Sequence, residues 1–374
     1  MERHLSRRQW LGTAAVCLSC THSGKAWADD KPKLADLIRD AHAKHGLAAL
    51  LCGVWNKDET ILTDARGESM TGVPATTDMH LRVGGVAYTC LAMALLRLAE
   101  KRSLSLDDPL SRWCPKLPQA AAVTLRMLAN CTSGYPDYVR SPAFIAQFLK
   151  NPFRQWRPQE LIDLGLATPL QYKPGTDWNY SHTNYVILGE ILQQVGGKSI
   201  GALLDQEICK PLGLTQTESP ATAALRWPVL HAFSTDRGIY EDCTFWSPSW
   251  AYPALMTSTL HDLGMLARAL GTDKLLSEKA RTEQIAPTTV GLGRLQKDFY
   301  YGLGVMLLNG WLVQNPRIDG YNLILAHLPS RRLSVVLAAT MGPKSAADVA
   351  YCTLIFKDIV KVLAPEVLLP EAFH

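Results

Sequence analysis

The chain has 374 residues, of which 47% are hydrophobic and 19% charged, with 38 Lys and Arg against 34 Asp and Glu. This length and apolar content suffice for a large buried core, in one large domain or in two interleaved lobes. The near balance of charge, without a basic patch, argues against a nucleic-acid partner, and no apolar run of about 18 residues predicts a membrane span.

The first 28 residues have the pattern of an export leader. Residues 6–11, SRRQWL, match a twin-arginine signal, a weakly apolar run follows to Leu18, and residues 26–28, AWA, have the small-x-small form of a cleavage site. This order predicts export to the periplasm or the extracellular space. A basic N-terminal tail is one alternative. A lipoprotein acylated at Cys20 is another, weakened because the leucine that usually opens such a site is absent.

Removal of the leader leaves 34 basic and 33 acidic residues and seven of the nine cysteines. An odd number of cysteines in an exported protein predicts at least one free thiol. No pair has CxxC spacing and no Cys/His cluster has the spacing of metal ligands, so we expect no metal and no cofactor. We expect mostly buried, apolar roles for these cysteines: Cys52, Cys90, Cys114, Cys131, Cys209, Cys243 and Cys352.

After the leader, residues 34–44 have the pattern of an amphipathic helix, and residues 48–55 and 60–65 that of two strands joined by a turn. Residues 81–100, LRVGGVAYTCLAMALLRLAE, then predict a short extended segment, a Gly84-Gly85 joint and a helix. The helix is apolar almost all round, which predicts a buried central helix. Its N-terminus would present backbone N–H groups to any cavity at the joint.

This stretch resembles the first catalytic motif of serine β-lactamases, D-Ala-D-Ala peptidases and class C-like esterases. In those families an aliphatic-Arg approach, matched here by residues 81–84, leads into Ser-x-x-Lys at the start of the central helix. Gly85 stands in the place of the nucleophilic serine and Tyr88 in the place of the lysine. Residues 71–100 contain neither serine nor lysine, so a shift in register does not restore the motif.

Two further segments support the resemblance. Residues 131–138, CTSGYPDY, correspond to a His-Thr-Ser-Gly-x-x-Asp loop of the family, with Cys131 in place of the histidine; Ser133 there is expected to form a turn. Residues 173–189, KPGTDWNYSHTNYVILG, resemble the second motif, Tyr-Ser-Asn, with Tyr180 kept and His182 in place of the asparagine. A phenol with a pKa of about 10 is a weak base unless a cation lowers its pKa, so Tyr180 is either a residual functional group or a pocket wall.

The C-terminal third returns to strands, predicted at 301–308, 311–314, 321–326 and 333–339, before a closing helix at 347–363. Together with the resemblance, this order predicts an α+β fold of the β-lactamase/transpeptidase type, in which an antiparallel sheet is flanked by terminal helices and carries a large helical insertion. We place the domain at 29–374, with the sheet lobe at 33–80 and 285–374 and the helical lobe at 81–284. An aromatic loop at 244–250 either roofs the site or packs in the core.

The third family motif, Lys-Thr-Gly or His-x-Gly, is expected just before Gly320-Tyr321, close to Gln314, Asn315 and Pro316, and neither form occurs there. The nearby Arg317 either supplies positive charge to a ligand carboxylate or is an exposed surface residue. We predict a ligand site at the seam between the lobes, formed by Gly85, Tyr88, Tyr180, His182, Gln314, Asn315 and Arg317.

Three hypotheses follow from the altered motifs. The leading one is an exported, non-acylating pseudoenzyme that binds a peptide, a cell-wall fragment or a β-lactam-like carboxylate. The second is an active hydrolase with a relocated nucleophile, for which Tyr180 and Ser181 are the nearest candidates; the third is a structural envelope protein with a closed cleft and a protein partner. The sequence predicts no oligomeric state.

Overall fold

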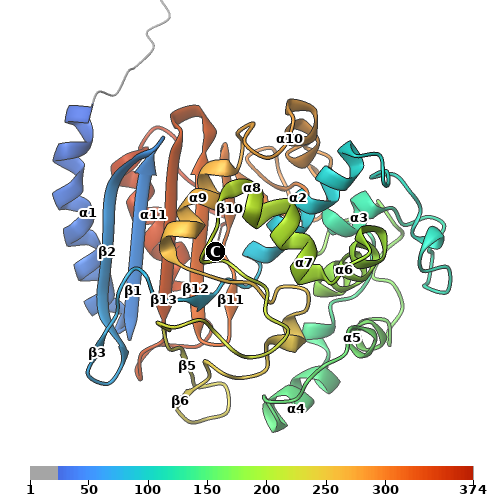
Figure 1. Ribbon diagram of the computed structural model, residues 1–374, viewed down its shortest axis with the longest axis horizontal. Helices are drawn as coiled ribbons and strands as arrows, with labels where there is room; N and C mark the ends of the chain where they lie inside the picture. Colours follow the sequence, from blue (N-terminus) through green and yellow to red (C-terminus); the bar gives the residue numbers. More distant parts are fainter. Residues whose placement is uncertain (1–23, 374) are drawn as a thin grey trace, which may run out of the picture.

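The computed structural model describes residues 24–373, with a nine-stranded antiparallel sheet at one side (Figure 1). The twin-arginine pattern, the apolar run and Cys20 lie outside these residues. The strands follow the order β3-β2-β1-β13-β12-β10-β9-β8, with β11 also paired to β12. Their bounds are β1 Ala49–Asn56, β2 Glu59–Met70, β3 Val73–Pro74, β8 Phe299–Tyr301, β9 Met306–Leu308, β10 Trp311–Gln314, β11 Arg317–Ile318, β12 Tyr321–Leu328 and β13 Leu333–Thr340.

The centre of the sheet joins the two ends of the chain, as the sequence predicted. β13 pairs with β1 on one side and with β12 on the other, both antiparallel. All eight residues of β12 and all eight of β13 are buried, because helices cover both faces of the sheet. The prediction of one continuous strand at 301–308 was wrong. The chain turns between β8 and β9, where Gly304 has φ +66°, a conformation that favours glycine.

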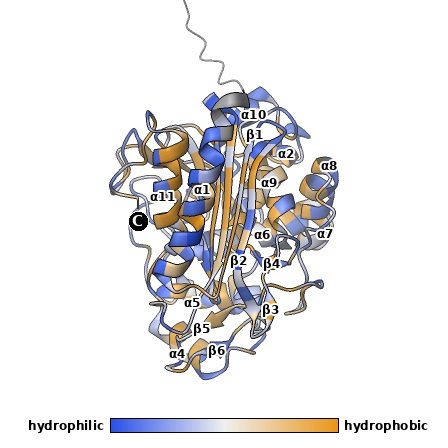
Figure 2. Cartoon of the chain, turned by 90° about the vertical axis from the view of Figure 1, so that its left-hand side faces the viewer, coloured by the Kyte–Doolittle hydropathy of each residue, from blue (hydrophilic) through white to orange (hydrophobic). Residues whose placement is uncertain are grey.

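One face of the sheet is covered by the terminal helices α1 (Gly24–His45) and α11 (Tyr351–Leu363), which contact each other (Figure 2). Helix α1 begins ten residues earlier than the predicted segment 34–44 and includes the predicted cleavage site at 26–28. The early turns lack apolar periodicity, but Trp27 packs into the core between these helices and the sheet and is only 4% exposed. This tertiary contact is what the local pattern could not reveal.

The other face packs against α9 (Leu260–Ala269) and, beyond it, the helical insertion. Helix α9 is capped by the Thr259 side chain, as expected. The remaining helices are α2 Val86–Glu100, α3 Leu125–Ala129, α4 Pro142–Lys150, α5 Pro158–Gly165, α6 His182–Gly196, α7 Ile200–Leu204, α8 Lys210–Leu212 and α10 Glu278–Gln284. Two further pairs of short strands lie outside the main sheet. They are β4 Leu81–Arg82 with β7 Thr257–Ser258, and β5 Phe233–Ser234 with β6 Glu241–Asp242. The α+β architecture predicted from the sequence is therefore confirmed, while the lobe boundaries remain a prediction.

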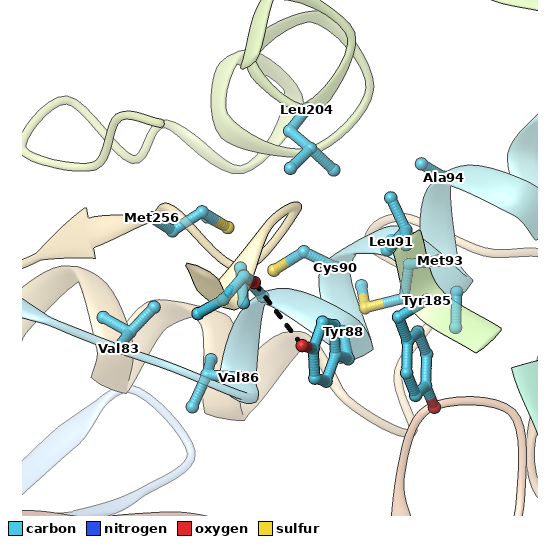
Figure 3. Close-up of a cluster of buried hydrophobic side chains, with 14 of the residues drawn as sticks. Val83, Val86, Tyr88, Cys90, Leu91, Met93, Ala94, Tyr185, Leu204 and Met256 are labelled. Atoms are coloured by element: carbon cyan, nitrogen blue, oxygen red, sulfur yellow. Dashed lines mark hydrogen bonds between the residues drawn. The ribbon is translucent and has the colours of Figure 1, made fainter. Parts of the chain in front are cut away.

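Helix α2 is the buried central helix that its composition indicated. Twelve of its fifteen residues are buried, and its side chains pack against α6, α7 and the strand β7 region (Figure 3). The seven cysteines of the described chain are all free, six of them buried and Cys114 partly buried, in agreement with the predicted apolar roles. Across residues 24–373 no helix is both long and apolar enough to cross a membrane. The same residues contain no group of three potential metal ligands.

Candidate ligand site

The Gly84-Gly85 joint lies against the segment that follows β10. Gly84 has φ +49°, and a Cβ there would come within 3.0 Å of the Pro316 Cβ, so this position requires glycine. Gly85 differs, because its φ of −60° and ψ of −9° suit any residue. A Cβ at Gly85 would meet only ordinary contacts, at 3.5 Å from Pro316 Cβ, 3.6 Å from Gln314 Oε1 and 3.7 Å from Tyr180 Oη.

The structure therefore brings the positions of all three family motifs together at Gly85. The side chains of Tyr180 and Gln314 converge on the point from which a serine hydroxyl would project. The backbone geometry at this point does not require glycine.

Tyr88, one turn further along α2, belongs to the core. Its ring stacks on Tyr185 with centroids 4.0 Å apart and planes at 10°, and its hydroxyl donates to the Ala251 carbonyl at 3.5 Å (Figure 3). The side chain is 1% exposed and does not line the cavity described below. In this structure Tyr88 is a core residue, and its contact with a ligand remains a prediction.

Within residues 24–373, no lysine or arginine is hydrogen-bonded to Tyr180 or lowers its pKa. Its ring lies edge-on to His182, with centroids 5.1 Å apart, and beside Tyr301 at 6.1 Å. Burial, reinforced by the neighbouring phenols, raises the pKa of Tyr180 well above its ordinary value. A raised pKa favours the protonated hydroxyl at neutral pH, which makes Tyr180 a weaker base than a free phenol. The structure supports its reading as part of the pocket wall.

His182 opens α6 and pairs with Asp137, a residue that sequence reasoning did not select. His182 Nδ1 lies 3.1 and 3.2 Å from the two carboxylate oxygens, and the backbone N–H groups of His182 and Val139 donate to Asp137 Oδ1. Burial works to raise the pKa of Asp137, but the His182 charge and these hydrogen bonds hold it below its ordinary value. The only sequence signal was the aspartate of the loop at 131–138, which gave no indication of its partner 45 residues away.

These groups line a cavity of about 830 Å³. Its wall includes six of the seven predicted residues, Gly85, Tyr180, His182, Gln314, Asn315 and Arg317. Three of them are fixed by hydrogen bonds to the surrounding chain. Gln314 donates to the Gly304 carbonyl at 2.6 Å, Asn315 to Thr353 Oγ1 at 3.2 Å, and Arg317, which is exposed, to the Ala347 carbonyl at 3.3 Å. Their contact with a ligand remains a prediction.

Sequence reasoning missed much of the aromatic and acidic wall. Trp250, in the aromatic loop, lines the cavity, whereas Trp246 of the same loop is buried in the core. Further lining residues come from α4, from the segment before α6, from the end of β8 and from the turn after β11. They include Phe144, Phe148, Trp178, Tyr301 and Asp319.

The alternative nucleophiles are buried and occupied. Ser181 is fully buried and donates to the Pro136 carbonyl at 3.2 Å, and Ser133 donates to Asn184 Oδ1 at 2.6 Å while accepting from the Tyr135 N–H, the turn role expected for it. Burial raises the pKa of the Cys131 thiol to about 11 and also raises that of Cys90. Each of these groups is therefore buried, and both serine hydroxyls are already hydrogen-bonded.

The fold and the arrangement of the three motif positions define a β-lactamase/transpeptidase-like protein, and sequence comparison agrees. The family described as Beta-lactamase matches residues 34–353, so the chain belongs to this family. It is 30% identical over 146 residues to penicillin-binding protein 4* of Bacillus subtilis, a match covering 38% of this chain and 31% of that protein. A second B. subtilis relative, the putative penicillin-binding protein PbpX, is 23% identical over 68% of this chain and 60% of its own length.

Both curated relatives are thus matched over less than two thirds of their length. Among solved structures, a D-stereospecific amidohydrolase from Streptomyces sp. superposes with a TM-score of 0.78 at 27% identity, covering 90% of this chain and 99% of that one. The family therefore includes proteins named for penicillin binding and for amide hydrolysis, and the shared fold does not choose between such activities.

Proposed function

We propose that this chain is a non-acylating member of the family that binds a small ligand without forming a covalent bond to it. The observation that carries the proposal is the combination at the start of α2: Gly85 offers no attacking atom, and Tyr88 fills the lysine position with a ring stacked in the core. The cavity beside Gly85 remains, with a volume of about 830 Å³.

The loss of reaction rate expected without the serine and the lysine favours a binding function over a catalytic one. Removing the nucleophile from a serine protease lowers turnover on the order of 10⁶-fold. A general base contributes about 10²- to 10⁴-fold, and Tyr180 does not supply one because its pKa is raised. The partial charge at the N-terminus of α2 is too weak to compensate for both losses. Burial of Ser181 likewise disfavours the hypothesis of a relocated nucleophile.

The ligand classes that we propose are a peptide, a cell-wall fragment or a related carboxylate. The name of the Streptomyces structural relative places D-configured amides first in a panel of test compounds. The open cavity favours this proposal over a purely structural role, which would not require one. We further propose export to the periplasm or beyond, supported by the order of charge, apolar run and cleavage pattern at residues 6–28.

Intact-mass analysis after incubation with a penicillin and with a fluorophosphonate tests the absence of acylation. We expect the mass of the protein to remain unchanged, while a serine β-lactamase, run in parallel, reports whether the reagents are active. A stoichiometric adduct, or saturable turnover of an amide, ester or lactam by pure protein, overturns the proposal. Ligand-dependent thermal stabilisation by cell-wall peptides distinguishes a binder from a structural protein, because a binder gains stability with ligand concentration.

A further inference from the structure

The acidic and basic residues that line the cavity differ in how far they are buried. The three arginines, Arg140, Arg294 and Arg317, are exposed, as are Asp236 and Asp348. The two buried charged side chains are both carboxylates, Asp137 and Asp319. Asp137 is paired with His182, which leaves Asp319 as the buried acidic group to be accounted for.

Asp319 is 9% exposed and has one side-chain partner, the Trp250 indole, whose Nε1–H lies 3.2 Å from each carboxylate oxygen. Its nearest cationic neighbour, Arg82, donates instead to the carbonyls of Ala223 at 2.6 Å and Thr244 at 3.2 Å. Within residues 24–373 no Lys, Arg or His nitrogen forms an ion pair with Asp319. A buried carboxylate without a direct ion pair is costly, and the charge of the buried Arg82 offsets only part of that cost from beyond hydrogen-bond distance.

The surroundings of the Asp319–Trp250 pair are aromatic. The Trp250 ring lies 6.1 Å from Phe144 and 5.6 Å from Phe148, measured between centroids, and all three rings line the cavity. Tyr180 lies on the same wall. The faces of aromatic rings attract cations, by about 0.5–2 kcal/mol for each contact, and this attraction is greatest where water is excluded.

We propose that the cavity selects an organic ammonium ion with an apolar body, and that the ammonium group binds at Asp319 beside the Trp250 ring. The inference rests on the proposed function, because it names the ligand class of that same site. It departs from the carboxylate ligands suggested by the sequence, because the three arginines that line the cavity are exposed whereas Asp137 and Asp319 are buried. Recognition would combine one ion pair, formed with a carboxylate whose only side-chain hydrogen bond comes from the Trp250 indole, with burial of the apolar body among the rings.

The pH dependence of binding follows from the environment of Asp319. Burial raises the pKa of Asp319 to about 7, opposed by the charge of Arg82 and the indole hydrogen bond and reinforced by Asp236. Cys243 and Tyr321 also face this region, and both remain neutral because burial raises their pKa values. An ammonium ligand should therefore bind more tightly as the pH rises through about 7, where Asp319 becomes ionised.

Calorimetric titration with phenethylamine, phenethyl alcohol and phenylacetate tests the proposal, because the three probes share a ring and differ in charge. Above about pH 8, where Asp319 is ionised, we expect phenethylamine to bind at least about tenfold more tightly than the alcohol. Asp319→Asn should abolish this preference while retaining an oxygen acceptor for the indole. Asp348→Asn, which neutralises an exposed carboxylate on the same cavity wall, is the matched control and should leave the preference unchanged.

Equal affinity for amine and alcohol, tighter binding of phenylacetate, or an amine preference that survives Asp319→Asn would each overturn the ammonium assignment. Should the Asn variant fail to fold, the pH profile of phenethylamine binding to the unaltered protein decides, and a flat profile between about pH 6 and 8 refutes it. Binding of phenylacetate alone would defeat this inference and leave the non-covalent receptor intact. A covalent adduct with a penicillin would instead defeat the proposed function, so the two failures are distinguishable.

Discussion

Restoring the two side chains of the family's first motif should affect stability very differently at two neighbouring positions. Gly85→Ser adds a Cβ whose nearest neighbours lie 3.5–3.7 Å away, in a backbone conformation that any residue adopts. Gly85 is also the N-cap of α2, where glycine and serine differ by only a few tenths of a kcal/mol. We therefore expect the free energy of unfolding to change by less than about 0.5 kcal/mol.

Tyr88→Lys should lower the free energy of unfolding by about 3 kcal/mol or more. Loss of a fully buried ring costs about 3–5 kcal/mol when a cavity remains, and the stacking on Tyr185 adds about 0.5–1.5 kcal/mol. The lysine stem refills part of the space, but its amine must be buried as well. Tyr88→Phe is the matched control; it removes only a hydroxyl with a 3.5 Å hydrogen bond and should cost no more than about 1 kcal/mol.

Urea unfolding followed by circular dichroism measures all three variants, with the slope of the transition checked for constancy. The expected order of stability is Gly85→Ser close to the unaltered protein, then Tyr88→Phe, then Tyr88→Lys well below. If Tyr88→Lys is as stable as Tyr88→Phe, the ring is not a core element and our account of the lysine position is wrong. A loss of more than about 1.5 kcal/mol in Gly85→Ser would contradict the space that we assign to a side chain there.

Three further predictions concern pH and the N-terminus. Burial, reinforced by two nearby arginines, lowers the pKa of His327 to about 4 in the folded protein, below the unfolded value of about 6.5. The free energy of unfolding should therefore fall as the pH drops from about 6.5 to about 4. His327→Gln should remove up to about 3 kcal/mol of this pH dependence, measured by urea titration at each pH. His182→Gln should raise the pKa of Asp137 and move the acid-unfolding midpoint upward, because stability from a depressed carboxyl pKa is present above about pH 4 and lost below it. Deleting residues 1–28 removes Trp27, which is 4% exposed, and should cost about 1.5–3 kcal/mol relative to deletion of 1–23; equal unfolding curves would contradict this.

The fold could be predicted from the sequence where local pattern and chain order agreed. The apolar helix after Gly84-Gly85, the Thr259 cap and the pairing of N- and C-terminal strands all appear in the structure. The helix and the cap depend on properties of a few adjacent positions, whereas the strand pairing was expected from the order of the strands together with the family resemblance. The sequence also predicted that Gly85, Tyr180 and Gln314 lie close together, because the order of the motifs along a known fold implies their proximity.

The remaining errors concern contacts between distant segments. Helix α1 extends to Gly24 because Trp27 finds a place in the core, and nothing in the neighbouring residues indicates that contact. The pairing of Asp137 with His182, and of Asp319 with Trp250, depends on loops whose side-chain directions have no periodic signal. Sequence reasoning selected Tyr88 for the ligand site because of its position in a motif, whereas stacking on Tyr185 places it in the core.

Gly85 and Tyr88, the two departures from the family's first motif, are not structurally equivalent. Gly85 could become serine again at almost no structural cost, because the space and the backbone conformation are present. Tyr88 is integrated into a stacked pair within the central helix, so a lysine there would require repacking of α2 against α6. A hydroxyl regained at position 85 would still face Tyr180 without a cation to lower its pKa. Under the proposed function, the absence of acylation would therefore depend more on the buried ring at position 88 than on the absent hydroxyl at position 85.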